Sequence, residues 1–360
     1  MTLSPVFRSP SAVLLLQEEG IWDRLGPAVS SQAQAVRTVH EDLARILDPG
    51  FLAETPPVPV AGAELDIDGL PFLQEYFFLI LFRSLFELFG VAPERLERYA
   101  EVNFCVKGTI TAADNIFDEQ AKSLLPLRAG EGSRFMSILQ LMCFERLIRR
   151  TLDRGVEAGE LDASQRDLVL KGLLDMMARI GRLEGSEEGG VDEIPTPADM
   201  VERVHRVRGG ALFALAFVAP SILEEGEVLD RVRRAEPAVA RLGTAFQIVD
   251  DLTDFEFDLG RRSHNLVVAQ VRHEGTAEER SLMDRLWRGE GEDAAGLVEG
   301  PFQASARAVL DRAYVEARAA FRELADLGFW FPDRLADDVV HAIVGLDGVR
   351  RMQTLSAGPR

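Results

Sequence analysis

The sequence predicts an all-α protein, and three observations lead to this interpretation. Ala, Leu, Glu and Arg, which favour helices, dominate the composition, whereas tyrosine, which favours strands, occurs only 3 times in 360 residues. Apolar residues recur at helical spacing, and no segment has the alternating pattern of a half-buried strand. Apolar residues make up 47% of the chain, which suffices for a large core in one or two domains.

Prolines and glycines divide the chain into successive helices. We expect residues 1–60 to form an N-terminal helical arm, with a helix at about 11–47, followed by a Pro-rich linker. Residues 61–360 are expected to form a single α-helical domain. Its helices are predicted at about 71–90, 94–117, 133–155, 163–183, 196–223 with a kink at Gly209-Gly210, a helix that begins at Glu236-Pro237 and carries residues 250–254, and then 303–327 and 332–345.

Charge and cysteine usage exclude several classes of protein. The formal net charge of −19 argues against a nucleic-acid partner, because such a partner requires a basic surface. Cys105 and Cys143 lie in apolar helical contexts, which favours buried, reduced thiols and a cytoplasmic location. No apolar run reaches the roughly 20 residues of a membrane span, so we expect none. The Cys and His residues have no zinc-type spacing.

One acidic cluster follows an apolar helical run, in the segment Phe246-Gln247-Ile248-Val249-Asp250-Asp251-Leu252-Thr253-Asp254. Asp250 and Asp254 are four residues apart, so they project from one face of a helix, and Asp251 lies on the flank. Like charges at this spacing repel one another unless a cation lies between them. Ligation by carboxylates alone suits a hard cation such as Mg²⁺.

A second cluster with the same spacing occurs in Asp114-Asn115-Ile116-Phe117-Asp118-Glu119, where Asp114 and Asp118 are again four residues apart. Either cluster alone also fits a helix end or a solvated helix face. The cluster at residues 114–119, which comes first in the chain, lies at the C-terminal end of the helix predicted at 94–117, where the helix dipole disfavours carboxylates, so we expect a cation to select them. Facing each other across a helical bundle, the two clusters would form a multi-metal diphosphate clamp.

These motifs resemble those of the trans-isoprenyl (polyprenyl) diphosphate synthases and class I terpene synthases. Residues 246–254 resemble the second aspartate-rich motif of the polyprenyl branch, FQxxDDxxD, at every position. Residues 114–118 resemble the first motif, DDxxD, with Asn115 in place of the second aspartate. Residues 208–213 are similar to the K-T-x-x-L-F segment, with Arg208 in the lysine position. The resemblance implies an isoprenoid synthase-type helical bundle with a central cavity.

The resemblance also implies a set of functional residues. It assigns catalysis to the four aspartates Asp114, Asp118, Asp250 and Asp254, and it implies three Mg²⁺ ions that bridge the diphosphate of an allylic prenyl substrate. The expected metal ligands are Asp114, Asp118, Glu119, Asp250, Asp251 and Asp254. The expected diphosphate contacts are Arg208, Gln247, Arg261 and Arg262. A homodimer is implied as well.

Several of these residues have a plain structural alternative. Arg208 also fits an ion pair, Gln247 a helix-packing amide, and Glu119 a solvated neighbour of the cluster. Lys122 is a further candidate for the diphosphate. The aromatic residues of the region are expected mainly in the core, although one or two fit the wall of a prenyl cavity that stabilises a cation: Phe77, Phe78, Phe104 and Phe117.

The departures from the family pattern favour one reaction over another. Elongating synthases bind isopentenyl diphosphate with a basic GGKRxRP segment, but residues 68–75 read DGLPFLQE and contain no cation. The arginine pair that usually follows the first motif is also absent. We therefore expect a terpene synthase that ionises one allylic prenyl diphosphate. The alternatives are an elongating prenyltransferase and a non-catalytic subunit of a synthase.

Overall fold

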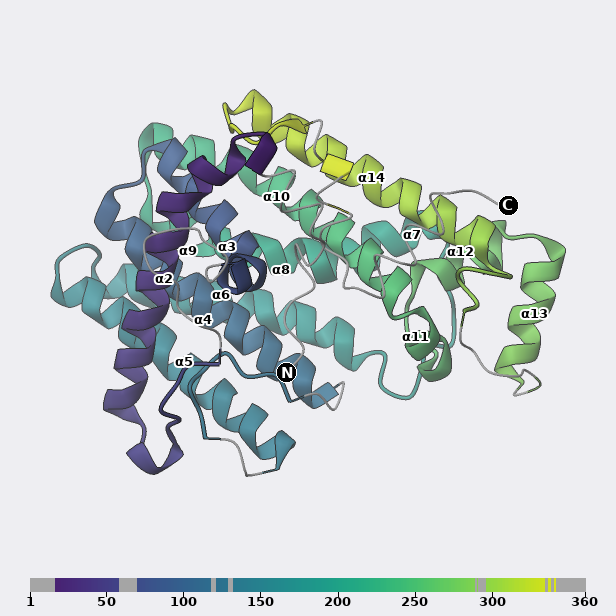
Figure 1. Cartoon of the computed structure of the whole chain (residues 1–360), viewed down its shortest axis with the longest axis horizontal. Coiled ribbons are helices and arrows are strands. Elements are labelled where there is room, and N and C mark those ends of the chain that lie inside the picture. The colour runs from purple at the N-terminus through teal and green to yellow at the C-terminus, as the bar shows by residue number, and fades with distance from the viewer. Residues whose placement is uncertain are drawn as a thin grey trace. The chain divides into compact units, whose positions relative to one another are not determined.

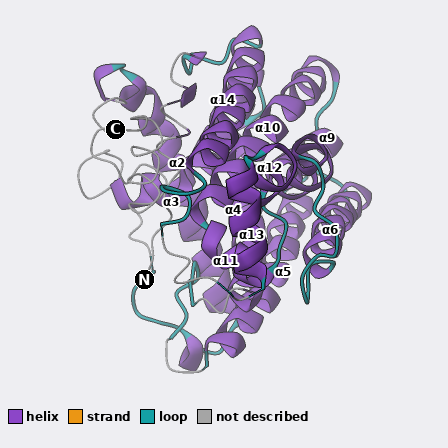
Figure 2. Ribbon diagram, turned by 90° about the vertical axis from the view of Figure 1, so that its right-hand side faces the viewer, coloured by secondary structure: helices purple, strands orange, loops and turns teal. Residues whose placement is uncertain are grey.

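The computed structural model describes residues 17–57, 70–117, 121–128, 132–288, 290, 296–333, 336–337 and 340. Helices account for the regular structure of these residues, as Figure 2 shows. The β-type pairing among them is a single isolated bridge between Leu52 and Leu127. The predicted all-α class is confirmed.

The chain divides into two compact units, which we describe separately. The first comprises the described residues of Leu14–Leu174 and Leu215–Arg233, and the second those of Asp175–Ala214 and Arg234–Arg360. The boundary expected between residues 60 and 61 lies outside the described residues and stays a prediction. In chain order the helices (Figure 1) are α2 (Ile21–Ile46), η1 (Pro49–Phe51), α3 (Leu70–Phe89), α4 (Pro93–Phe117), α5 (Ser133–Glu157), α6 (Ala163–Gly185), α7 (Pro197–Asp199), η2 (Met200–Gly210), α8 (Ala211–Ala214), η3 (Leu215–Phe217), α9 (Val218–Leu223), α10 (Gly226–Thr253), α11 (Phe255–Arg261), α12 (Leu266–Glu274), α13 (Ala277–Trp287) and α14 (Gln303–Asp326).

In the first unit, α4 packs against α2, α3 and α5. Phe104 of α4 is fully buried, and its ring contacts those of Tyr76 and Phe144 at centroid distances of 5.7 and 5.9 Å. Gly108 lies one turn further on, where a Cβ atom would overlap the Phe144 ring. The close approach of α4 and α5 therefore depends on a glycine. Cys105 and Cys143 are buried free thiols, as the sequence predicts.

Buried charges also connect the helices of this unit. Arg154 of α5 lies 3.0 Å from Asp42 of α2 and forms an ion pair with Glu101 of α4. Asp42 and Glu101 are 1% and 4% exposed. Burial raises the pKa of Glu101, while Arg154 and Arg98 oppose the shift. Arg154 therefore pairs with both buried carboxylates, together with Arg45 at Asp42 and Arg98 at Glu101.

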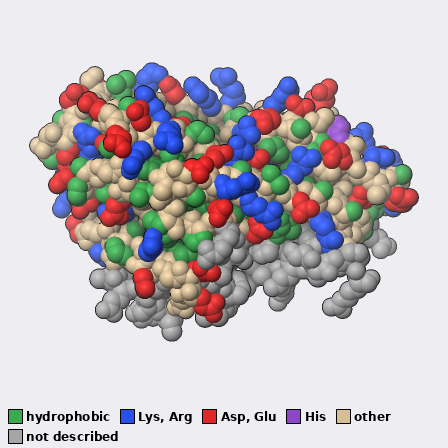
Figure 3. Space-filling view, turned by 90° about the horizontal axis from the view of Figure 1, so that it is seen from above, with side chains coloured by type: hydrophobic (Ala, Val, Ile, Leu, Met, Phe, Trp, Pro, Cys, Tyr) green, Lys and Arg blue, Asp and Glu red, His purple; other side chains and the backbone are tan. Residues whose placement is uncertain are grey.

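In the second unit, α12 packs against α13, α14 and η2. The Asn265 side chain caps α12 by accepting hydrogen bonds from the backbone N–H groups of Val267 and Val268. Phe255 and Phe302 are buried and meet edge to face at 5.6 Å. On the face drawn in Figure 3, the basic side chains among the described residues are interspersed with acidic ones, in keeping with the acidic net charge.

The predicted bounds agree with the structure for most helices, with several differences. The helix predicted at about 11–47 is wrong at its start, because Gly20 has a left-handed conformation and α2 begins at Ile21. The sequence analysis predicted none of α11, α12 and α13, and the helix predicted at 332–345 lies largely outside the described residues.

The start predicted at Glu236-Pro237 is wrong, because α10 begins at Gly226 and Pro237 lies inside it. An interior proline costs about 3 kcal/mol, but Val232 and Val239 on either side are fully buried and hold the helix in place. The expected kink at Gly209-Gly210 is instead the end of η2, an 11-residue π-helix that continues into α8.

One helical stretch among the described residues, Pro197–Leu223, is long and apolar enough to span a membrane, with a mean hydropathy of 1.4 over its most apolar window. Half of that window is buried inside the protein, as in the core helix of many soluble proteins. A single helix of this kind is weak evidence for a membrane.

Candidate metal and diphosphate site

The acidic cluster of the second unit lies where α10 ends and α11 begins. Ile248, Val249 and Leu252 are buried and fix one face of α10 in the core. Asp250 consequently lies half-buried and Asp254 exposed, where both carboxylates can reach a ligand. The Asp254 N–H donates to the Asp250 carbonyl at 2.9 Å, so the two aspartates are joined by a last helical turn.

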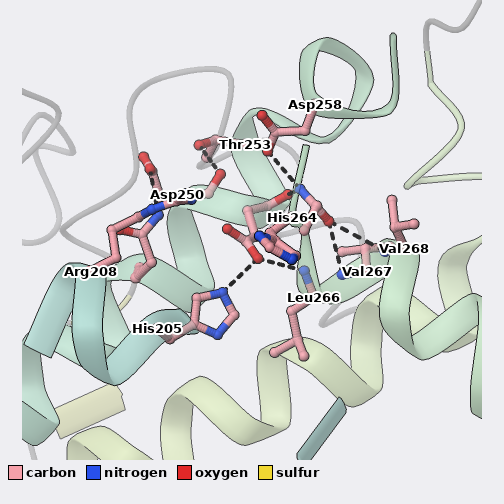
Figure 4. A network of polar contacts seen from close by, with 12 residues as sticks. His205, Arg208, Asp250, Thr253, Asp258, His264, Leu266, Val267 and Val268 are labelled. Carbon is pink, nitrogen blue, oxygen red and sulfur yellow. Dashed lines mark hydrogen bonds and ion pairs between the residues drawn. The ribbon is translucent and has the colours of Figure 1, made fainter. Parts of the chain in front are cut away.

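Asp251 has a different environment from its neighbours. Its side chain is 2% exposed, and His205 of η2 is fully buried beside it. The Asp251 Oδ2 atom accepts hydrogen bonds from His205 Nε2 at 2.8 Å and from the Leu266 backbone N–H at 2.5 Å (Figure 4). Because this oxygen is an acceptor, the His205 hydrogen lies on Nε2. Asp251 thereby connects η2, α10 and the start of α12.

Asn265 strengthens the same junction. Its amide Nδ2 donates to the Asp251 carbonyl at 2.7 Å and to Asp258 Oδ2 at 2.9 Å. Its Oδ1 accepts from the first N–H groups of α12. The fully buried amide thus uses its donors and its acceptor at once. It fixes α10, α11 and α12 around the acidic cluster.

Asp258 adds a fourth carboxylate. Burial, followed by the charge of Asp251, raises the pKa of Asp258 to about 8; Asp254 adds to the shift, while Asn265 and Arg208 oppose it. The described residues contain no preformed group of three metal-binding side chains. The donor set nevertheless suits Mg²⁺, because clustered carboxylate oxygens repel one another until a hard cation neutralises them.

Arg208 of η2 is held by two carboxylates. It lies 2.5 Å from Glu184 Oε1 and 2.5 Å from Glu187 Oε1, with 12% of its side chain exposed. Burial lowers the pKa of Arg208, but Glu184 and Glu187 outweigh this effect, so the pKa is raised. His264 Nδ1 donates to the same Glu187 oxygen at 2.6 Å. Arg208 therefore forms the ion pairs that were the structural alternative to a diphosphate contact, and its side chain is mostly buried.

The other predicted diphosphate contacts lie on α10 and at the end of α11. Gln247 is buried and donates from Nε2 to Asp250 Oδ2 at 3.2 Å. Arg261 and Arg262 are exposed at the end of α11. The Arg261 guanidinium lies 4.9 Å from the Phe257 ring centroid, and Arg262 Nη2 donates to the Trp287 carbonyl at 3.2 Å. These two arginines therefore carry charge that solvent reaches.

The first acidic cluster belongs to the other unit. Asp114 is exposed near the end of α4, and Asp118 and Glu119 lie outside the described residues. Asn115, which replaces the second aspartate of the motif, is buried. Its Nδ2 donates to the Lys122 carbonyl at 2.6 Å, and its Oδ1 accepts from the Lys122 N–H at 3.2 Å. A carboxylate at this position could not donate to the Lys122 carbonyl. The asparagine therefore fixes the backbone of Lys122 beside the last turns of α4. That the two clusters converge stays a prediction.

Several residues of this region escaped sequence analysis, and their signals differ in strength. Asp258 continues the four-residue spacing of Asp250 and Asp254, and Asn265 precedes an apolar run as a helix cap does. Both residues could therefore have been identified from the sequence. Neither His205 nor the Glu187–His264 pair has a local pattern that marks it, because each contact joins residues distant in the chain.

Comparison with known proteins supports the fold. No family model matches the chain, and no protein of curated function matches it. Among solved structures, a decaprenyl diphosphate synthase from Rhodobacter capsulatus superposes with a TM-score of 0.59 at 17% identity, covering 94% of this chain and 99% of that one. A polyprenyl synthase from Caulobacter crescentus, complexed with calcium and isoprenyl diphosphate, gives 0.60 at 16% identity, covering 91% and 98%. A geranylgeranyl pyrophosphate synthase from Lactobacillus brevis gives 0.58 at 14% identity, covering 86% and 96%. The predicted isoprenoid synthase-type fold is confirmed.

Proposed function

Starting from a chain with the fold of the polyprenyl diphosphate synthases, we propose that this protein is a Mg²⁺-dependent class I terpene synthase-type enzyme. It ionises the C–O bond of a linear allylic prenyl diphosphate. Breaking this bond gives pyrophosphate and an allylic carbocation, which cyclises or captures water and then loses a proton to give a neutral hydrocarbon or alcohol. The observation that carries the proposal is the pair of accessible carboxylates Asp250 and Asp254, which lie one helical turn apart at the end of α10.

In this proposal Asp250 and Asp254 of the second unit hold Mg²⁺ together with Asp114 and Asp118 of the first, in a set of three ions. Glu119 is a further candidate ligand. When bound, Mg²⁺ acts as a Lewis acid on the diphosphate and stabilises the charge that develops on it. Asp251 keeps the ligand helix in place, because its Oδ2 is already engaged by His205 and Leu266. The other carboxylate oxygen of Asp251, Oδ1, stays a candidate ligand for Mg²⁺.

The cationic side chains have separate roles. Arg261 and Arg262 are exposed beside the acidic junction, and we assign them the contact with the diphosphate oxygens. Gln247 orients Asp250 through its hydrogen bond. Arg208 positions Glu187 and His264 and reaches phosphate only by exchanging a carboxylate partner.

A second candidate function is chain elongation with isopentenyl diphosphate, because the solved structures of this fold reported above are prenyl synthases. A non-catalytic synthase subunit is a weaker candidate, since an inactive chain has no need of two acidic clusters. We further propose that the protein acts in the cytoplasm as a homodimer.

The test is product analysis with linear allylic prenyl diphosphates from geranyl to geranylfarnesyl, each with Mg²⁺, with and without isopentenyl diphosphate. The proposal expects a hydrocarbon or alcohol from a single substrate. A longer diphosphate formed only when isopentenyl diphosphate is present would establish elongation instead. Activity that needs a partner synthase would indicate a subunit.

Matched variants connect this activity to the acidic cluster. We expect Asp250→Asn and Asp254→Asn each to reduce kcat/KM by about 10²-fold or more, the scale of one lost charge-stabilising contact. Asp230→Asn removes a charge from an exposed position of the same helix and should retain activity. Undiminished turnover in the Asp250 variant would reject the assignment.

A further inference from the structure

Three charged side chains form a compact cluster in the first unit. Glu75 of α3 forms an ion pair with Lys107 of α4, and Lys122 Nζ lies 3.7 Å from the same Glu75 oxygen. The Glu75 side chain is 1% exposed, whereas those of Lys107 and Lys122 are 25% and 24% exposed. One buried carboxylate therefore pairs with two lysines whose side chains are partly exposed.

The local backbone holds Glu75 in this position. Tyr76, the next residue, has non-helical dihedral angles inside α3, with φ −115° and ψ 16°. The helix is interrupted there, and the Lys107 ammonium lies 5.1 Å from the centroid of the Tyr76 ring. The Tyr76 side chain is buried, so Lys107 has an anionic partner and an aromatic one.

The two lysines also lie beside the first acidic cluster. Lys107 precedes Asp114 by seven residues, so it lies on the same face of α4, about 10 Å along the helix. Lys122 is held by Asn115, which bonds both its N–H and its carbonyl, and by Gln140 Nε2 at 3.1 Å from that carbonyl. The backbone of Lys122 is therefore fixed beside Asn115, the residue that follows Asp114.

We infer that Glu75 is a built-in counter-anion that occupies the lysine pair and prevents an external diphosphate from binding there. This inference rests on the proposed function, in which the enzyme uses one diphosphate substrate and has no second anion to bind. Glu75 is thus a specificity-determining residue, which touches the lysines and not the reacting atoms.

The charges give the physical reason. Two ammonium groups that share a partly buried location repel each other, and a carboxylate between them removes that repulsion. Burial lowers the pKa of Lys107 and Lys122 adds to this effect, while Glu75 opposes it. Without Glu75 the pair would lose the carboxylate that contacts both ammonium groups, and a diphosphate is the kind of anion that such a pair attracts.

The experiment is calorimetric titration with inorganic pyrophosphate in EDTA, so that no divalent ion connects the anion to the aspartates. We expect Glu75→Gln to bind pyrophosphate about tenfold more tightly than the wild type, or more, which corresponds to one charge contact. Glu75→Asp keeps the counter-anion and should behave as the wild type. Glu87→Gln, at an exposed position of α3, makes the same change of charge and should also have no effect.

The gain in pyrophosphate affinity of Glu75→Gln must depend on Lys107 and Lys122. In Glu75→Gln combined with Lys107→Gln and Lys122→Gln, the tighter binding should be lost. Equal affinity in the folded Glu75→Gln variant and the wild type, or a gain that persists in the triple variant, would overturn the inference. If Glu75→Gln does not fold by circular dichroism, Glu75→Met supplies an uncharged side chain of similar size for the same titration. Since no prenyl substrate and no metal are present, the result stands independently of whether the proposed reaction occurs.

Discussion

His205 Nε2 lies 2.8 Å from Asp251 Oδ2, and both side chains are buried. This contact joins the π-helix η2 to the acidic end of α10. The same carboxylate oxygen accepts the Leu266 N–H at the start of α12. A π-helical segment adds a residue to a turn and so changes the direction of its side chains, which is one way to bring a histidine to such a position.

Replacing His205 tests this junction. His205→Ala leaves the buried Asp251 carboxylate with one donor fewer, so we expect the free energy of unfolding to fall by about 3 kcal/mol, as for a buried charge that loses its partner. Denaturant unfolding followed by circular dichroism measures the change. The control is His273→Ala, because His273 is exposed and its ring contacts the Ile194 carbonyl. Equal stability of the two variants would contradict a structural role for the pair.

The raised pKa of Asp258 predicts a pH dependence of stability in metal-free protein. The ordinary pKa is 3.8 and the folded value is about 8, so between these values the folded protein retains a proton that the unfolded chain has released. The free energy of unfolding should therefore fall as pH rises through this window. Asp258→Asn has no proton to lose and should show a flatter profile. Parallel profiles in EDTA would show that Asp258 ionises normally.

Arg154 tests the buried charges of the first unit. Arg154→Met removes one partner from each of Asp42 and Glu101, while Arg45 stays 2.7 Å from Asp42 and Arg98 3.5 Å from Glu101. We therefore expect a loss of about 1.5–3 kcal/mol in the free energy of unfolding, as for lost hydrogen bonds to charged groups. Arg150 makes a longer contact with Asp42, at 3.8 Å, and its side chain is 40% exposed. Arg150→Met should therefore cost less than about 1 kcal/mol. Thermal melting of the two variants compares them, and similar losses would be inconsistent with this account.

Two glycines determine how closely η2 approaches α10. A Cβ atom at Gly209 would overlap the Gly243 carbonyl oxygen, and a Cβ atom at Gly243 would overlap the Gly209 carbonyl oxygen. Gly243→Ala should therefore destabilise the protein by about 1–3 kcal/mol. Gly181→Ala lies in α6 with no atom near its Cβ position, so it should stabilise the protein by about 0.5–1 kcal/mol. A neutral Gly243→Ala variant would show that the two backbones can separate without cost.

The sequence predicts the parts of this protein that depend on local pattern. Helical periodicity and breakers give the all-α class and place α4 from Pro93 to Phe117 and α14 from Gln303 to Asp326 within a residue or two. The aspartate spacing identifies the end of α10. Pro237 led to a wrong helix start, because a proline normally begins or ends a helix. The buried residues on either side, Val232 and Val239, keep Pro237 inside α10.

The contacts that define the site are not local. His205 and Asp251 are 46 residues apart, and Lys122 and Glu75 are separated by a comparable length of chain. No periodicity reports such pairs. The sequence shows that residues 68–75 contain no cation, but it does not show that Glu75 turns toward two lysines supplied by other segments.

The most direct measurement of the central claim is pyrophosphate release from a single allylic prenyl diphosphate in the presence of Mg²⁺, with isopentenyl diphosphate left out. We predict one pyrophosphate for each hydrocarbon or alcohol formed, and loss of this release in Asp250→Asn. No release from any allylic substrate alone, with turnover once isopentenyl diphosphate is added, would contradict it.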